Sequence, residues 1–336
     1  MFWLGLFFFA VIPGLIAFEI LRDVYLETRS DRIPILLYHR LISREAVRAG
    51  RVRDDEPIYV CYDDVFAEQM KYLHDAGYAT LSMDDYVAIR SGRAQQPEKP
   101  VVVTFDDGYE SNYSLAYPAL RRFAQRATIY VAPEPDAHTR ELVDGVDGFL
   151  SPDQMRELDA NGVAIESHTL THSILRELPD ERARFELEES KRRLSEIVGR
   201  PVRHLAIPRA GYSRRIRRLV RACGYQTVCC NNKGSSTGLT DPLALPRIVI
   251  ERDTSPADFQ RLLRPLPATM LRIIGNLKRV PERLFGPSAA RRLRVRLYDG
   301  PLGGLFVTRR LKRAVLGSAL IYAFACVAFY WHILLR

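Results

Sequence analysis

Two short segments of the chain carry the side chains best suited to chemistry. Asp106 and Asp107 are adjacent, and His168 and His172 follow later in the sequence, four positions apart. One carboxylate and two imidazoles would bind a divalent metal and leave a position open for water, the ligand pattern of catalytic zinc sites. The second carboxylate would remain free to act as a base. The combination favours metal-assisted hydrolysis, although either pair alone would be an ordinary turn or a polar helix face.

Two apolar runs would position these side chains. Residues 101–105 read as a strand, so the two aspartates would emerge at its carboxyl end, and residues 163–166 precede the histidines in the same way. In α/β barrels the active site lies at the carboxyl ends of the strands. Gly108 permits a tight turn that would let both carboxylates face one cavity. The spacing of the two histidines predicts a helical turn with both imidazoles on one side.

The central part of the chain alternates strand-like and helix-like segments. Buried parallel strands read as short apolar runs, and six such runs occur, at 34–38, 101–105, 127–131, 163–166, 204–207 and 225–229. Amphipathic stretches lie between them, at 65–76, 114–125, 152–161, 180–198 and 213–223. This alternation predicts an α/β fold, and the number of repeats favours a barrel over an open sheet.

The composition excludes some classes of protein. With 47% hydrophobic residues among 336, the chain can bury a substantial core, so disorder is not expected. The five cysteines are odd in number and include no CxxC pair, which argues against a disulfide framework or a cysteine zinc site. The formal net charge of +9 indicates an anionic partner, which could be nucleic acid, a membrane surface or an acidic substrate.

Both ends of the chain predict membrane helices. Residues 1–18 contain no charged side chain, and we expect a transmembrane anchor at 1–22, because neither a basic start nor a cleavage site supports a signal peptide. Residues 314–335 predict a second transmembrane helix, with a buried helix as the alternative. Basic residues gather just before this helix. The positive-inside rule therefore places the central domain on the cytoplasmic side of the cell inner membrane, with the periplasm as the alternative.

Residues 255–313 form a region rich in arginine, with interleaved apolar residues and prolines. Such a stretch can bind nucleic acid, but its adjacency to a membrane helix favours contact with anionic headgroups. We therefore expect anionic membrane lipids as partners and no nucleic acid. The domain order is an anchor at 1–22, a central domain at 33–254, this interfacial region, and a helix at 314–335.

The segments TFDDGY, at 104–109, and HTLTH, at 168–172, resemble the first two motifs of the polysaccharide deacetylases of carbohydrate esterase family 4, which share the NodB homology domain. Further matches extend the resemblance over about two thirds of the chain, and the domain is most similar to the biofilm-polysaccharide deacetylase branch. The resemblance implies a distorted (β/α)7-type barrel, here flanked by the two transmembrane helices.

The resemblance also assigns roles to the motif residues. It implies that Asp107, His168 and His172 bind the metal and that Asp106 is the general base. In the biofilm branch a histidine near the start of the domain is the general acid, and His39 matches it. Zinc is the expected metal, although iron, cobalt, nickel or manganese could fill the same ligands.

The chain departs from the family pattern at the third motif. Ala206 stands where many members have an arginine that orients the catalytic aspartate, and Arg209 is the candidate to supply the missing charge. By the same resemblance, Tyr109 and the third-motif residues Pro208, Arg209 and Gly211 would contact the substrate.

The sequence thus predicts an enzyme, a metal-dependent N-deacetylase that hydrolyses the N-acyl group, expected to be N-acetyl, of an amino sugar. The membrane segments favour a lipid-linked glycan precursor as substrate, and a polysaccharide fits if the domain lies outside. Because of the altered third motif, the alternative is a catalytically idle barrel that binds a glycan or glycolipid in a synthesis or export complex.

Overall fold

The computed structural model describes residues 18, 21–26, 28–50, 60–141, 147–252 and 254–265. Arg29–Ala268 form one compact unit, and the central domain predicted at 33–254 falls within it. No helix in the described part of the chain is long and apolar enough to cross a membrane. The predicted helix at 314–335, nearly all of the predicted anchor at 1–22 and most of the region 255–313 lie outside the described residues.

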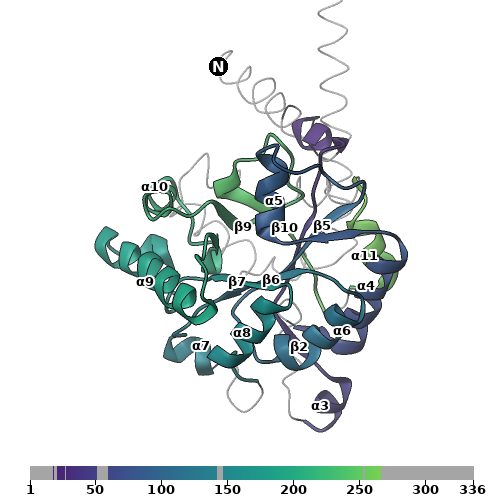
Figure 1. Ribbon diagram of the computed structural model, residues 1–336, viewed down its shortest axis with the longest axis horizontal. Helices are drawn as coiled ribbons and strands as arrows, with labels where there is room; N and C mark the ends of the chain where they lie inside the picture. The colour runs from purple at the N-terminus through teal and green to yellow at the C-terminus, as the bar shows by residue number, and fades with distance from the viewer. Residues whose placement is uncertain are drawn as a thin grey trace, which may run out of the picture. The chain divides into compact units, whose positions relative to one another are not determined.

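Seven parallel strands close into a barrel (Figure 1). Around the barrel they are β1 (Ile35–Tyr38), β10 (Leu245–Val249), β9 (Thr227–Lys233), β8 (His204–Ala206), β7 (Val163–Ser167), β6 (Ala127–Val131) and β5 (Pro100–Phe105). The pairing of β1 with β5, in which Tyr38 lies opposite Phe105, closes the ring. A further strand, β4 (Ala79–Leu81), pairs with β5 outside it. The predicted barrel is confirmed.

One barrel strand was missed by the sequence patterns. β10 reads Leu-Pro-Arg-Ile-Val, and its proline and arginine interrupt the apolar run that marks a buried strand. β9 also continues to Lys233, beyond the predicted end at Cys229. The arginine of β10, Arg247, is buried inside the barrel, so the missed strand brings a charge into the interior.

Helices surround the strands (Figure 1). Those predicted appear as α4 (Asp63–Asp75), α6 (Tyr117–Arg122), which continues the π-helix η2 (Asn112–Ala116), α8 (Pro152–Ala160), α9 (Asp180–Val198) and α10 (Arg214–Ala222). Shorter elements complete the layer: β2 (Arg40–Ile42), α3 (Arg44–Arg48), β3 (Val60–Tyr62), α5 (Met83–Arg90), α7 (Ala137–Glu141), η3 (Leu175–Glu177), η4 (Pro208–Ala210), η5 (Pro242–Ala244) and α11 (Pro256–Leu262).

Two apolar contacts close the domain, one at the amino-terminal end of the strands and one at its last helix. At the amino-terminal end of the strands, Met83 and Tyr86 of α5 pack against Ile35 and Val102 in an apolar cluster that fills the barrel there. At the carboxyl end of the domain, α11 buries Phe259 near Tyr72 of α4, with their rings 6.2 Å apart. Residues 256–262, the first part of the region 255–313 predicted to lie at a membrane interface, pack on the barrel domain through this aromatic contact.

Candidate active site

The turn after β5 presents the two aspartates. The amide of Asp106 donates to the carbonyl of Tyr38 at 3.0 Å, which continues the β1–β5 pairing one step beyond the strands. The chain then reverses because Asp107 and Gly108 both take left-handed conformations, with φ of 75° and 76°. A Cβ on Gly108 would lie 2.9 Å from Cγ1 of Val131. This position therefore requires glycine for its backbone angle and for the close approach of β6.

The loop after β7 carries the two histidines in a conformation that differs from the prediction. Residues 168–172 are not helical, and Thr169 and His172 each have a φ of 65°. Two left-handed residues within five turn both imidazoles toward Asp107. The prediction that both imidazoles lie on one side was therefore right, but the prediction of a helical turn was wrong.

Asp107, His168 and His172 form a cluster suited to a metal. The Nε2 atoms of both histidines lie 3.2 Å from Oδ1 of Asp107, and the three ligand atoms are within 4.8 Å of one another. All three residues are buried. Hydrogen bonds from the histidines hold the pKa of Asp107 well below its usual range, although burial by itself raises it.

The other ring nitrogens of both histidines are occupied. Nδ1 of His168 lies 2.9 Å from the carbonyl oxygen of Ala206, which can only accept, so this nitrogen carries a proton. In the neutral imidazole that a metal requires, the lone pair is then on Nε2. Nδ1 of His172 lies 3.0 Å from Oγ1 of Thr139 on α7. Hydrogen bonds of this kind orient metal-binding histidines. The two nitrogens and one carboxylate oxygen thus fit a divalent transition metal.

A buried ion pair holds the second aspartate. Nη1 of Arg247 donates to Oδ1 of Asp106 at 2.7 Å, and Nη2 donates to Oδ2 at 2.6 Å. The side chains are only 1% and 6% exposed. Burial raises the pKa of Asp106, but the charge of Arg247, followed by that of His168, outweighs it, and the pKa is lowered. Asp106 is therefore an ionised carboxylate with a fixed orientation.

Arg247, rather than Arg209, supplies the charge that the third motif lacks. β10 lies beside β1, and β1 beside β5, so barrel closure brings Arg247 to Asp106 across 141 positions of sequence. Arg209 is exposed at η4 with a φ of 49°. Burial raises the pKa of Asp136, but hydrogen bonds from Thr139, and after them the charge of Arg209, lower it. The prediction that Arg209 substitutes for the arginine was wrong.

His39 follows β1 directly and faces the same cluster. Burial lowers its pKa, while the charges of Asp107 and Asp106 oppose the effect. Asn112 donates to the backbone carbonyl of His39 at 2.8 Å and fixes the chain at this point. The barrel therefore brings together the five residues predicted for the metal and for acid–base catalysis, which come from the ends of β1, β5 and β7.

The four residues predicted to contact the substrate differ in how exposed they are. Tyr109 is 6% exposed and stacks on Phe149 with ring centroids 5.6 Å apart. Pro208 is buried, and a Cβ on Gly211 would lie 3.2 Å from the amide nitrogen of Leu175, so both pack within the loop. Arg209 alone presents an exposed side chain.

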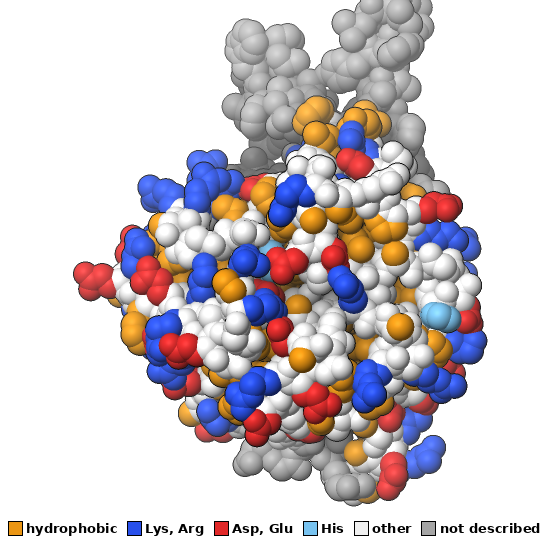
Figure 2. Space-filling view, in the orientation of Figure 1, with side chains coloured by type: hydrophobic (Ala, Val, Ile, Leu, Met, Phe, Trp, Pro, Cys, Tyr) orange, Lys and Arg blue, Asp and Glu red, His pale blue; other side chains and the backbone are white. Residues whose placement is uncertain are grey.

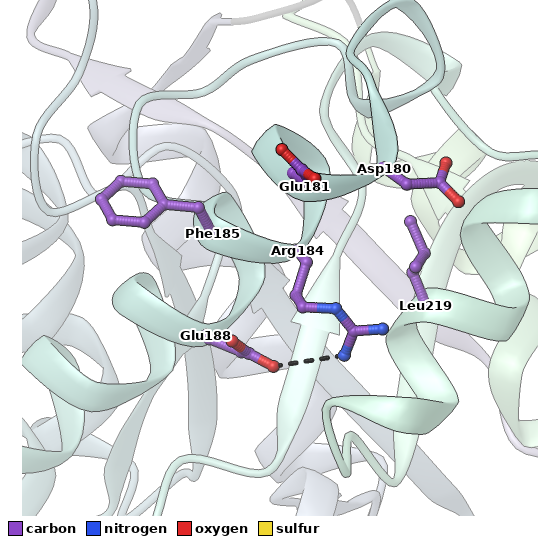
Figure 3. A pocket seen from close by; sticks show the side chains of 6 residues that line it. All are labelled: Asp180, Glu181, Arg184, Phe185, Glu188 and Leu219. Carbon is purple, nitrogen blue, oxygen red and sulfur yellow. Dashed lines mark hydrogen bonds and ion pairs between the residues drawn. The ribbon is translucent and has the colours of Figure 1, made fainter.

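A separate groove of about 500 Å³ lies on the outside of the domain, between α9 and α10 (Figure 3). Its lining includes Phe185 and the Arg184–Glu188 ion pair on α9, with Leu219 on α10. None of the five clustered residues borders it, so it is not part of the candidate active site.

Helix α10 carries a cluster of exposed arginines. Arg214, Arg218 and Arg221 are exposed along this helix, and none of them pairs with an acidic side chain within the described ranges. Figure 2 shows basic side chains clustered at the α10 edge, while both signs mix elsewhere on that face. Helix α10 is thus one surface of the barrel domain with the charge expected to attract an anionic partner.

Sequence reasoning gave no role to three residues around the site. Arg247 lies in Leu245-Pro246-Arg247, one of the further matches to the family, but no role was predicted for it, and none was predicted for Thr139 or the buried Glu186 of α9. A buried strand that contains an arginine is itself a signal, because such a charge needs a buried partner. Thr139 and Glu186 carry no comparable signal, because ordinary helices contain many such residues.

Comparisons with known proteins agree with this geometry. Residues 93–228 match the family model for polysaccharide deacetylase. YxkH of Bacillus subtilis (strain 168), classed with the same family by name, is 28% identical over 228 residues, which cover 68% of this chain and 75% of that protein. Poly-beta-1,6-N-acetyl-D-glucosamine N-deacetylase of Escherichia coli (strain K12) is 34% identical over 111 residues, 30% of this chain and 16% of that protein.

Solved structures share the fold. The deacetylase PplD of Streptococcus pyogenes, solved with acetate, matches with a TM-score of 0.61 and 24% identity over 70% of this chain and 100% of its own. IcaB of Ammonifex degensii matches with a TM-score of 0.55 and 20% identity over 73% of this chain and 98% of its own. Residues 93–228, which carry Asp106, Asp107, His168 and His172, therefore belong to a polysaccharide deacetylase domain, a domain of amide hydrolases acting on carbon–nitrogen bonds.

Proposed function

We propose that this protein is a metal-dependent N-deacetylase that removes an N-acyl group, N-acetyl in the simplest case, from an amino sugar. One observation carries the proposal: the cluster of Asp107, His168 and His172 lies beside a second carboxylate, Asp106, that Arg247 keeps ionised. A metal-binding cluster and a base are the two parts that amide hydrolysis of this type needs.

The chain's own residues divide the work. A divalent metal, with zinc as the expected ion, would supply Lewis acidity toward water and the acyl carbonyl. Asp106 would take a proton from the attacking water, because both its oxygens are oriented by Arg247 and its lowered pKa keeps it ionised. His39 would protonate the departing nitrogen. The low pKa that burial gives His39 makes it a strong acid once it is protonated.

The substrate we propose is an amino sugar in a lipid-linked glycan precursor. The named activity of the E. coli relative supports an N-acetylated amino sugar. The apolar segments at 1–22 and 314–335, the arginine-rich region before the second and the exposed arginines of α10 support a membrane partner. By the positive-inside rule, the domain would face the cytoplasm at the inner membrane. If it faces the periplasm, a polysaccharide becomes the better substrate.

The idle-barrel alternative loses its main support. It rested on the missing arginine of the third motif, and Arg247 supplies that charge from another strand.

An acetate-release assay tests the activity and the substrate class. It compares two substrates, an N-acetylated amino sugar on a polyprenyl phosphate and a β-1,6-linked N-acetylglucosamine oligomer. We expect release to stop on chelation, to return with zinc or cobalt, and to be lost in Asp106→Asn. Release that persists in Asp106→Asn, or that is unaffected by chelation, would refute the mechanism. A reporter fused after Arg336 tests the topology, and a cytoplasmic signal there would overturn the orientation.

The α10 arginines have their own test. The triple change Arg214→Gln, Arg218→Gln and Arg221→Gln should weaken binding to vesicles that contain phosphatidylglycerol, with a shallower dependence on salt. Lys71→Gln on α4 is the control, because this lysine already pairs with Asp75. Equal binding by the triple variant and the wild type would remove α10 as a lipid-binding surface.

A further inference from the structure

The loop that carries the two histidines is anchored from the outside by a buried carboxylate. Glu186 lies on α9 and is fully buried. Its Oε2 accepts from the amides of Leu170 at 3.1 Å and Thr171 at 2.9 Å, and its Oε1 accepts from the hydroxyl of Thr171 at 2.9 Å. Oε1 also accepts from Arg182 at 2.9 Å. Three of these four donors are in the histidine loop.

The opposite side of the same two residues is anchored as well. The carbonyl of Leu170 accepts from the amide of Glu134 at 2.9 Å, and the carbonyl of Thr171 accepts from the amide of Asp136 at 3.1 Å. The peptide group between Leu170 and Thr171 is therefore held on both sides, by Glu134 at its carbonyl and by Glu186 at its amide. Only the Glu186 side depends on a single side chain, so a substitution can release it.

Such an anchor matters because the loop has an unfavourable conformation. Thr169 and His172 flank Leu170 and Thr171, and both have a φ of 65°, which costs about 1–2 kcal/mol for a residue with a Cβ. These two left-handed residues turn the imidazoles toward Asp107. Without hydrogen bonds to hold Leu170 and Thr171, the loop would relax toward ordinary angles and the nitrogens would separate.

We propose that Glu186 is a positioning residue that preorganises His168 and His172, and so sets the metal affinity of the site. This inference rests on the proposed metal-dependent function. Among the described residues, Glu186 makes no hydrogen bond to Asp107, His168 or His172. It acts through the backbone of Leu170 and Thr171, and orienting partners of metal ligands typically change metal affinity 10–100-fold.

The test is metal binding by the folded protein, measured well below its melting temperature. In Glu186→Gln one carboxylate oxygen becomes an NH2 group, which faces either the two loop amides or the Thr171 hydroxyl and Arg182, so the neutral side chain cannot accept all four hydrogen bonds. Zinc affinity, measured by competition with a chromogenic chelator, should fall at least about 10-fold. The visible spectrum of the cobalt form should change as well, because it reports the geometry of the ligands.

Two variants separate positioning from ordinary stability. Arg182→Gln removes the partly buried ion pair to Glu186 but leaves the loop donors in place, so zinc affinity should stay within about threefold. Glu188→Gln changes a carboxylate on the same helix that pairs only with Arg184 and Cys223 among the described residues, and it should leave affinity and spectrum unchanged. Thr171→Val keeps both loop amides and loses one donor, so an intermediate loss is expected if Glu186→Gln does not fold.

The outcomes distinguish this inference from the proposed function. If the wild type binds neither zinc nor cobalt, the proposed function fails. If the wild type binds metal and Glu186→Gln melts at a lower temperature but keeps the same affinity and cobalt spectrum, Glu186 is only a structural contact and the inference is overturned. Unchanged affinity in Thr171→Val, where Glu186→Gln does not fold, overturns it too.

Discussion

Replacement of Arg247 by methionine tests the most specific claim about the site. Methionine is similar in length and uncharged, so the change removes the two hydrogen bonds to Asp106 and leaves a buried carboxylate without its cation. Two unit charges about 4 Å apart interact by about 4 kcal/mol at an effective dielectric constant near 20. Loss of one partner of a buried pair typically costs about 3–5 kcal/mol of stability. We expect a loss of this size in urea unfolding at neutral pH.

The sign of the pH dependence follows from the pKa of Asp106. Arg247 lowers this pKa, so the pair stabilises the wild type at neutral pH, and that contribution is lost as acid protonates Asp106. In Arg247→Met burial dominates and the pKa rises. The stability difference between wild type and variant should therefore shrink toward acidic pH.

The raised pKa of Asp106 in Arg247→Met should also change the pH dependence of activity. With its pKa raised, Asp106 is protonated over more of the working range, so the acidic limb of the pH profile of kcat/KM should move to higher pH. At neutral pH kcat should fall on the order of 10²-fold, the usual contribution of a general base. Arg217→Met, which removes a surface pair with Asp241, is the control and should leave the profile in place.

The double variant Asp106→Asn/Arg247→Met completes the test. It removes the unpaired charge, so it should be more stable at neutral pH than Arg247→Met while remaining inactive. An Arg247→Met enzyme with an unmoved acidic limb would refute the role assigned to Arg247. A double variant no more stable than Arg247→Met would refute the buried-charge explanation.

Three further predictions follow from single contacts. Thr139→Val removes the partner of Nδ1 of His172 and should weaken zinc binding about 10-fold by calorimetry, whereas Thr139→Ser should not; equal binding by all three proteins would contradict this role. Gly108→Ala should lower the free energy of unfolding in urea by about 1 kcal/mol more than Gly199→Ala does. Both glycines have a positive φ, but only a Cβ at Gly108 would contact Val131, so equal losses in the two variants would show that this contact does not matter. His39→Ala should lower kcat on the order of 10²-fold with metal content unchanged, and undiminished turnover would remove His39 from the mechanism.

Local patterns predicted much of the barrel because its strands are buried on both faces. Such strands read as continuous apolar runs, and six of the seven barrel strands were recognised in this way. β10 was missed because Pro246 and Arg247 break the run. A buried arginine needs a carboxylate nearby to neutralise its charge. Here that carboxylate is Asp106, 141 positions away in the sequence, so no local pattern reveals it.

The site shows the same division. Asp107, His168 and His172 were predicted as metal ligands, and they converge because the ends of parallel strands meet at one edge. The conformation of the histidine loop was not predicted, because left-handed angles at Thr169 and His172 persist only where tertiary contacts hold the loop. These contacts are the hydrogen bonds that the loop donates to Glu186 and accepts from the amides of Glu134 and Asp136.

The sequence by itself determined the chemistry available to this protein: two adjacent carboxylates and two imidazoles at the ends of strands, within the motifs of a deacetylase family. Side-chain types and short spacings are local properties, so they can be read directly. Tertiary structure alone decided which cation orients Asp106 and what holds the histidine loop in place. Both depend on closure of the barrel, which brings Arg247 to Asp106, and on the packing of α9, which brings Glu186 to Leu170 and Thr171.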